Sequence, residues 1–363
     1  MNTINNNTDI ISPPKFTISQ LLSLFGFTPF STITFQFVIP SLALCGLVLC
    51  LLTAWIFFQS RKDFSIPFYD YYKLTTLINI IHLSMAILYG FCFTPLYVPN
   101  TDGYKCRVFT IAYECLAQFF LYYTGVLEIA ALLERMKTFS LFVKKYYTLA
   151  PKLICLIMLG VCVIIDLFYA FNYVTGVWFD YYDENGENVL GSFYVAAPSS
   201  IAQSPIGSKA LIVLYFIRDF FTLIVGVILN IVSLIQLRAF LTNRSKRLGV
   251  HYIEASNLTS DLNVTTISSS QVTAPLRDVD KQVERNLLFM VVTLCSISIV
   301  SRLTLITTNT YFLFRNDGIT LILVTLTDLV IVLGPCLSFF VFVFFNKLFR
   351  QHLRSILFVR RRR

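Results

Sequence analysis

The sequence predicts an all-α membrane protein, a bundle of seven transmembrane helices with the N-terminus outside and an amphipathic eighth helix. Of the 363 residues, 56% are hydrophobic and only 13% are charged, whereas a soluble chain averages about 25% charged residues. A soluble domain cannot hide so much apolar surface from water. Most of the 29 Lys and Arg residues lie between long apolar stretches or at the C-terminus. The net charge of +9 therefore fits membrane topology better than nucleic-acid binding.

Seven apolar stretches are each long enough to cross a bilayer. A hydrocarbon core about 30 Å thick needs roughly 20 helical residues. Barrel strands would be shorter and would alternate in polarity, so we expect helices, which satisfy their own backbone in lipid. The expected spans are residues 33–58, 68–94, 108–133, 152–174, 209–238, 286–312 and 318–345. The expected domains are an extracellular N-terminal segment, the seven-helix domain, and an amphipathic helix with a basic cytoplasmic tail, at residues 1–32, 33–345 and 346–363.

The distribution of Lys and Arg predicts the orientation. These residues are concentrated after the first, third, fifth and seventh spans, and segments rich in Lys and Arg face the cytoplasm. We therefore expect a multi-pass protein of the plasma membrane with an extracellular N-terminus. Asn6 heads a glycosylation triplet, in agreement with this orientation. Asn243, Asn257 and Asn263 head similar triplets in a segment that the charges place inside, and we give the charges more weight.

Two connecting segments have distinctive compositions. Residues 239–285 are polar and poor in aromatic residues, which predicts a flexible cytoplasmic segment whose ends extend the fifth and sixth helices. Residues 175–208 include WFDYYDENGEN and are a candidate lid over an extracellular mouth. Seven of the nine cysteines lie in apolar stretches, where cysteine usually packs as a small hydrophobe. Cys92 and Cys106 lie near an outer edge, so the sequence allows at most one disulfide.

The third span ends in LLERMKTF, where Glu134 and Arg135 are adjacent. Charged residues commonly mark the interfacial end of a span. In a seven-span chain with its N-terminus outside, however, this stretch resembles the Asp-Arg-Tyr motif of rhodopsin-like G-protein-coupled receptors, with Met136 in place of the tyrosine. The resemblance implies that the arginine is restrained at rest and released when the sixth helix moves outward. It also implies contact of a heterotrimeric G protein with Arg135, with Phe142 or Val143, and with the basic ends of the fifth and sixth helices.

The end of the seventh span carries a second resemblance. SFFVFVFFNKLFRQHLRSIL is similar to the family's Asn-Pro-x-x-Tyr region followed by an amphipathic eighth helix. Ser338, Phe339 and Phe342 occupy the positions of the motif's Asn, Pro and Tyr. The apolar face of the following helix is predicted to contain Phe349, Leu353, Ile356 and Leu357, with Arg350 and Arg354 on its other sides. Such a helix lies in the lipid interface, as a generic basic tail on anionic lipid also would.

The chain departs from the family pattern at several positions. The sixth span has no Cys-Trp-x-Pro, and the second offers Asn79 and His82 instead of an Asp. The family's outer disulfide cannot form because residues 175–208 contain no Cys, which leaves a Cys92–Cys106 bridge as a substitute. These departures fit a divergent branch, similar to invertebrate chemosensory or FMRFamide-type neuropeptide receptors.

Ionisable residues inside the spans cost about 2.5–3.5 kcal/mol each at the bilayer centre. Six lie at comparable depth, namely Glu114, Asp166, Arg218, Asp219, Arg302 and Asp328. In one interpretation the arginines pair with Asp166, Asp219 or Asp328 and hold the bundle together. In the other, the layer is the floor of an outward-facing pocket for a cationic ligand, with aromatic walls from Tyr122 and Tyr123. The family resemblance makes Asp328 the best ligand candidate, and Glu128 is expected to bond neighbouring helices deeper in the third span.

No catalytic set is visible in the sequence. The three histidines, His82, His251 and His352, are scattered, and no metal-ligand spacing or nucleotide loop occurs. We therefore expect no enzyme activity, cofactor or metal. The expected partners are an extracellular peptide or small molecule, a heterotrimeric G protein and the lipid bilayer. A ligand-gated channel or transporter of the plasma membrane is the alternative, although paired repeats and broken spans are not evident.

Overall fold

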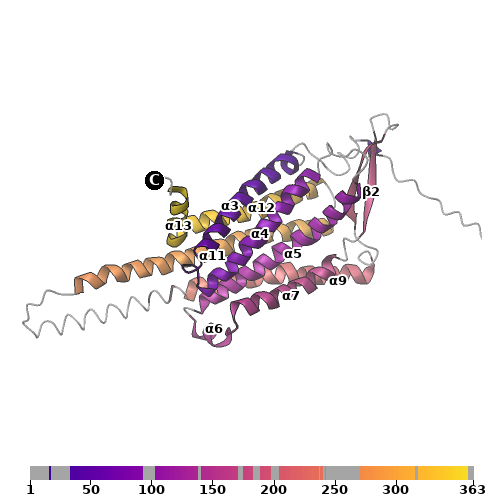
Figure 1. Ribbon diagram of the computed structural model, residues 1–363. Helices are drawn as coiled ribbons and strands as arrows, with labels where there is room; N and C mark the ends of the chain where they lie inside the picture. The colour runs from indigo at the N-terminus through magenta and orange to yellow at the C-terminus, as the bar shows by residue number, and fades with distance from the viewer. Residues whose placement is uncertain are drawn as a thin grey trace, which may run out of the picture.

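Long helices side by side make up most of the computed structural model (Figure 1). The structure describes residues 16–17, 33–92, 103–137, 140–170, 175–182, 189–197, 204–236, 238–239, 242, 270–314 and 318–358. The helices are α3 (Ile39–Gln59), α4 (Pro67–Cys92), α5 (Gly103–Met136), α6 (Leu141–Tyr146), α7 (Pro151–Ala170), α9 (Pro205–Tyr215), α11 (Ser270–Phe314), α12 (Gly318–Phe345) and α13 (Lys347–Phe358). Two π-helical segments are η1 (Thr34–Val38) and η3 (Phe216–Phe221), and the helix after η3 continues over residues 222–236.

Five stretches of the described helices are long and apolar enough to cross a membrane. They are Ile39–Gln59, Cys115–Met136, Pro205–Gln236, Phe289–Thr308 and Ile322–Phe345. These stretches define a multi-pass membrane protein. Helices α4 and α7 lie at the second and fourth expected spans and pack against α3 and α5, respectively. The outer surface of α7 is apolar, with exposed Leu156, Ile164 and Leu167.

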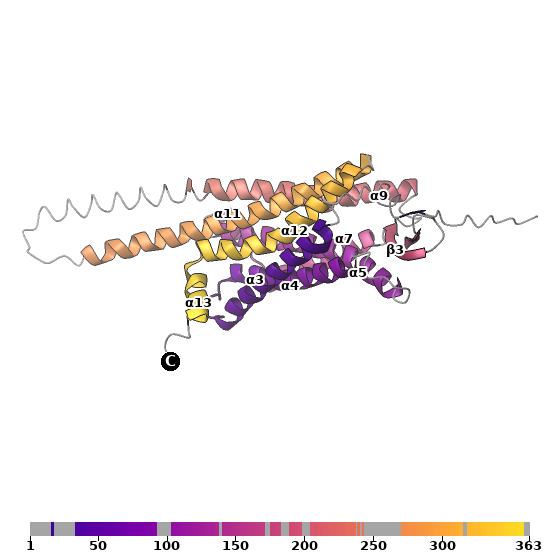
Figure 2. The ribbon, with the colours of Figure 1, turned by 90° about the horizontal axis from the view of Figure 1, so that it is seen from above.

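Helix α11 is much longer than the sixth expected span. It begins at Ser270, sixteen residues before the expected start at residue 286, and contains 45 residues. At 1.5 Å per residue its length is about 68 Å, more than twice the thickness of a hydrocarbon core of about 30 Å. Figures 1 and 2 show its N-terminal part projecting beyond the ends of α3, α4 and α12. The prediction that residues near 285 extend the sixth helix is therefore confirmed. The prediction of a flexible segment over residues 239–285 is wrong for residues 270–285, which are helical.

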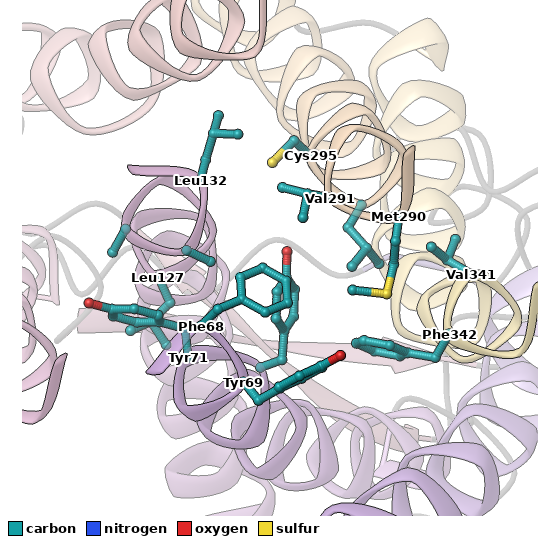
Figure 3. Packing of buried hydrophobic residues seen from close by; sticks show 14 of the residues in the cluster. Phe68, Tyr69, Tyr71, Leu127, Leu132, Met290, Val291, Cys295, Val341 and Phe342 are labelled. Carbon is teal, nitrogen blue, oxygen red and sulfur yellow. The ribbon is translucent and has the colours of Figure 1, made fainter. Parts of the chain in front are cut away.

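Helix α13 is fixed to the bundle by an aromatic cluster that consists of Phe57, Phe64, Tyr69, Phe342 and Phe349. Phe57 is at its centre, with its ring centroid 5.1 Å from that of Phe64, 5.3 Å from that of Phe342 and 5.9 Å from that of Phe349. Phe57 and Phe349 are fully buried. Figure 3 shows Phe342 of α12 beside Met290 of α11, with Tyr69 of α4 directed toward the same space. The cluster therefore joins α3, α4 and α12 to the start of α13.

Polar contacts hold α13 at two further points. The side-chain oxygen of Asn346 accepts a hydrogen bond from the backbone N–H of Phe349 (3.1 Å), which caps the helix. The same side chain donates to the Tyr69 hydroxyl (3.0 Å). His352 lies one turn further on, with Nδ1 2.9 Å from the Ser60 hydroxyl and Nε2 2.8 Å from Asp63 Oδ2. Helix α13 is thereby bonded to α4 and to the turn after α3.

A pair of strands occupies the segment that the sequence analysis expected only as a loop. Strands β2 (Thr175–Tyr182) and β3 (Val189–Ala197) pair antiparallel, and β1 (Phe16–Thr17) pairs parallel with β2. Val, Phe, Tyr and Trp favour strands. The acidic residues of this segment are typical of a loop and outweighed that preference in the prediction. Strand β3 contacts α5, and the hairpin lies at the end of the bundle opposite α13 (Figure 1). This is the position that a lid would occupy.

Some predictions fall outside the described residues. They are the glycosylation of Asn6, the triplets at Asn243, Asn257 and Asn263, and the side chains of Cys92 and Cys106. The seven described cysteines are free thiols, as expected for those in apolar stretches.

Replacing Phe349 with Ala should lower the free energy of unfolding by about 3 kcal/mol, because it empties a fully buried site in the aromatic cluster. Thermal unfolding of the purified protein in detergent measures this loss. Leu357→Ala is the matched control on the same helix, since the Leu357 side chain is 61% exposed. Equal effects of the two substitutions would contradict the proposed anchoring role of Phe349.

Candidate functional site

Arg218 is the centre of a buried charge network between three helices. Its side chain is 2% exposed. It donates to both carboxylate oxygens of Asp219, from Nε at 3.0 Å and from Nη2 at 2.7 Å. Nη1 lies 3.5 Å from Asp166 Oδ1 on α7, and Nη2 donates to Gln118 Oε1 on α5 at 3.4 Å. The interpretation that both buried arginines pair with Asp166, Asp219 or Asp328 is therefore confirmed for Arg218, with the first two acids. The hydrogen bonds described for Arg302 go to main-chain carbonyls instead.

Arg218 and Asp219 are consecutive residues of the π-helical turn η3 (Phe216–Phe221), and both are buried. The hydroxyl of Thr222 donates to the main-chain carbonyl of Arg218. Single π-turns are frequent at functional sites.

Arg302 of α11 bonds the main chain of α5. Its Nη2 donates to the carbonyl oxygens of Leu121 (3.1 Å) and Tyr122 (3.2 Å), and the side chain is 4% exposed. The guanidinium lies directly over Gly125, where an added Cβ would be 1.5 Å from Nη2 and 2.2 Å from Cζ. Only the absence of a side chain at residue 125 allows Arg302 to reach α5 in this position.

Glu128 lines two small cavities in the interior. Each has a volume of about 20 Å³, enough for a single water molecule. One lies between α5, α11 and residues 222–226, and Arg302, Ser298 and Gly226 also line it. The other lies between α3, α4 and α12, with polar groups from Thr53, Thr75, Thr76, Asn79 and Ser338. Glu128 therefore lies between the helices, as expected, and its polar neighbours come from both sides of the bundle.

A second polar group lies where α5 ends. Glu134 Oε2 is 2.9 Å from Lys137 Nζ, and that ammonium lies 4.5 Å from the centre of the Tyr147 ring. The Tyr147 hydroxyl lies 3.0 Å from that of Tyr71 and donates to the Ala130 carbonyl at 3.5 Å. Burial raises the pKa of Tyr147 to about 12, so this hydroxyl is a donor at neutral pH. Arg135 lies within electrostatic range of the Tyr69 hydroxyl, which Asn346 also bonds.

Helix α6 presents an exposed apolar surface next to this group. Leu141 is 85% exposed, Phe142 72% and Tyr146 65%. The hydroxyl of Ser140 accepts from the Val143 backbone N–H at 3.4 Å and caps the helix. The Val143 side chain is half-buried. An apolar surface of this kind, with Lys144 and Lys145 beside it, is typical of a site that contacts another protein or the membrane surface.

The structure brings some of the predicted ligand-binding residues together. Asp219 lies in the charge network, and Tyr122 supplies a carbonyl to Arg302. The Tyr123 hydroxyl donates to the Cys155 carbonyl of α7 at 3.0 Å, which is a packing role. Asp328 is half-exposed on α12. The side chain of Glu114 lies outside the described residues.

Sequence reasoning missed several residues of these sites. Gln118, Gly125, Tyr71, Tyr147 and Asn346 all make contacts between elements far apart in the chain. Of these residues, Gly125 could have been noticed in the sequence, because a glycine inside an apolar helix often marks a close approach of another group. Within the described ranges, no three His, Cys, Asp or Glu residues gather in a way that could hold a metal ion.

Comparison with known proteins does not place the chain in a family. No model of a known protein family matches the chain, and a search of curated proteins finds no similar sequence.

Replacing Arg218 with Met should lower the free energy of unfolding by about 3–5 kcal/mol, because Asp219 and Asp166 then lose a buried cationic partner. Thermal unfolding in detergent measures the change. A triple variant, Arg218→Met with Asp166→Asn and Asp219→Asn, removes the stranded charges and should recover most of the loss. The charge network would not be a stabilising unit if the triple variant were as unstable as the single one.

Proposed function

We propose that the chain is a seven-transmembrane receptor of the rhodopsin-like class, which binds an extracellular ligand and activates a heterotrimeric G protein. In this proposal α4 and α7 are the second and fourth spans, the N-terminus is extracellular, and α13 is the eighth helix at the inner surface of the plasma membrane. The single observation that carries the proposal is the grouping of features at the end of the bundle where α5 ends.

Four features meet at that end. The Glu134–Arg135 pair lies in the last turn of α5, and exposed α6 follows immediately. Asn346 and α13 are bonded to Tyr69, which is near Arg135. The N-terminal part of α11 extends beyond the bundle on the same side (Figure 1). A cytoplasmic partner that contacts α6 would therefore also reach α11 and the arginine.

The distribution of charge supports the orientation. Lys144 and Lys145 lie on α6, Lys137 follows the end of α5, and Arg350 and Arg354 lie on α13. Lys and Arg mark the cytoplasmic side of membrane proteins. The opposite end carries the β2–β3 hairpin over α5 and is the side from which a ligand would enter. Epitope tags at the two termini, stained in intact and in permeabilised cells, test this orientation. An intracellular N-terminus would contradict the proposal.

Ion conduction is the main alternative to G-protein activation. The purified protein in liposomes should pass no ionic current, with or without ligand, and cells without G proteins should give no response. Current through the purified protein would instead support the ligand-gated channel.

Replacing Arg135 with Ala should reduce G-protein activation by a factor of about 5–150, the range of typical coupling energies, while surface expression stays close to that of the unchanged protein. Nucleotide exchange on a panel of G proteins measures activation, and surface staining measures expression. Arg61→Ala is the matched control, because Arg61 is an exposed arginine on the same side of the bundle. Parallel loss of activation and of surface protein would show that Arg135 has a structural role.

Replacing Asp328 with Asn should weaken the binding of a cationic ligand by roughly 30-fold or more, as expected when a charge pair is broken at a binding site. Binding of a neutral ligand should change little. A library of peptides, amines and odorants screened against a cell reporter supplies the two ligands. If both bind equally weakly to the variant, Asp328 supports the fold rather than the ligand.

A further inference from the structure

Helix α6 is too short to be stable by itself. It contains six residues, Leu141–Tyr146, and none of their side chains is buried. Isolated helices shorter than about 12–15 residues are marginal in water, and most helices in proteins are stabilised by packing instead. The hydroxyl of Ser140 caps the first turn of α6. Contacts outside the helix must therefore hold its other end.

Tyr147 holds that end. Its backbone N–H donates to the carbonyl of Val143 at 2.8 Å and closes the last turn of α6. Its hydroxyl lies 3.0 Å from that of Tyr71 on α4 and donates to the Ala130 carbonyl of α5 at 3.5 Å. Tyr71 is fully buried, so it gives Tyr147 a fixed partner. One side chain thus joins the end of α6 to two helices of the bundle.

Lys137 fixes the ring of Tyr147. Its ammonium lies 4.5 Å from the centre of that ring, which is the geometry of a cation–π contact. The same ammonium lies 2.9 Å from Glu134 Oε2 in the last turn of α5. The Lys137 side chain is 22% exposed and that of Glu134 12%, so salt screens these contacts less than it screens contacts at the surface. Lys137 therefore connects the end of α5 to the residue that ends α6.

A second lysine–tyrosine contact in the same segment has a different environment. Lys145 Nζ lies 5.4 Å from the centre of the Tyr146 ring, but both side chains are exposed. An exposed cation–π contact contributes less than one that is shielded from water. Both residues of this pair also lie on α6 itself. Of the two pairs, the one formed by Lys137 and Tyr147 connects α6 to the bundle.

We propose that Lys137 and Tyr147 are positioning residues for α6, which they fix in one orientation before a partner binds. The exposed apolar side chains of α6 are thereby presented as a preformed surface, with Lys144 and Lys145 beside them. This surface fits a protein partner that has an apolar hollow with acidic groups at its edge. A preformed surface binds more tightly, because little order has to be imposed on binding. That the partner is a G protein rests on the function proposed above.

Hydrogen exchange of the α6 amides tests the positioning directly. The Lys144 amide donates to the Ser140 carbonyl at 3.0 Å. In the full-length protein in detergent, Lys137→Met and Tyr147→Leu should each raise the exchange rate of this amide by about threefold or more. Lys137→Arg keeps a cation over the ring and should retain most of the protection. Lys145→Met is the matched control and should leave the rate unchanged.

Nucleotide exchange gives the second readout. With the purified chain in vesicles, the G-protein concentration for half-maximal ligand-free exchange should rise by about threefold or more in Lys137→Met and in Tyr147→Leu, at an unchanged maximal rate. A mere loss of folded protein would lower the maximal rate and leave that concentration unchanged. The double variant should match Tyr147→Leu, because Lys137 has no ring left to contact. Lys62→Met is the control, since Lys62 is exposed in the turn after α3.

The two readouts separate the positioning role from the proposed function. If the unchanged chain activates no G protein but Lys137→Met still raises α6 exchange, the positioning role stands and the receptor proposal fails. Unchanged α6 exchange in Lys137→Met and Tyr147→Leu overturns the positioning role, and so do equal effects of Lys137→Met and Lys145→Met. Faster α6 exchange with an unchanged half-maximal concentration contradicts the link to partner binding.

Discussion

A charged side chain inside lipid must find its partners within the protein, because the hydrocarbon core offers no hydrogen bonds. The arrangement of the bundle around α5 depends on this constraint. Arg218 meets it with the carboxylates of Asp219 and Asp166 and the amide of Gln118. Arg302 meets it with two main-chain carbonyls of α5. Each solution requires a particular rotation of its helix, so the two arginines orient η3 and α11 toward α5.

A local feature accompanies each solution. Arg218 and Asp219 lie in the π-turn at Phe216–Phe221, and the missing side chain at Gly125 lets a guanidinium approach the α5 backbone. Near the other end of α5, the polar group around Glu134 and Tyr147 joins that helix to α4, and the aromatic cluster joins α3, α4 and α12 to α13. Buried arginines with hydrogen-bond acceptors therefore hold the middle of the bundle together, whereas aromatic packing holds the end near α13.

Hydropathy predicted where the long described helices lie, because a run of about 20 apolar residues in a chain of this composition has few other structures available. The charges inside those runs suggested two alternatives, and the pairing of Arg218 with nearby acids was one of them. Hydropathy did not predict the strands of residues 175–197, where acidic residues obscured the β-branched and aromatic pattern, or the start of α11 at Ser270, where a polar helix lacks an apolar signal. Contacts such as that between Tyr71 and Tyr147, 76 residues apart, depend on helix rotation and packing, which one sequence does not reveal.

The length of α11 has a mechanical consequence. Arg302 lies 32 residues from Ser270, the first residue of that helix, which corresponds to about 48 Å along its axis. A tilt of about 10° around the level of Arg302 would displace the far end by about 8 Å, the arc swept by a rod of that length. A small tilt of α11 at the level of Arg302 would therefore be amplified, by simple leverage, into a displacement of several ångströms at its first turn.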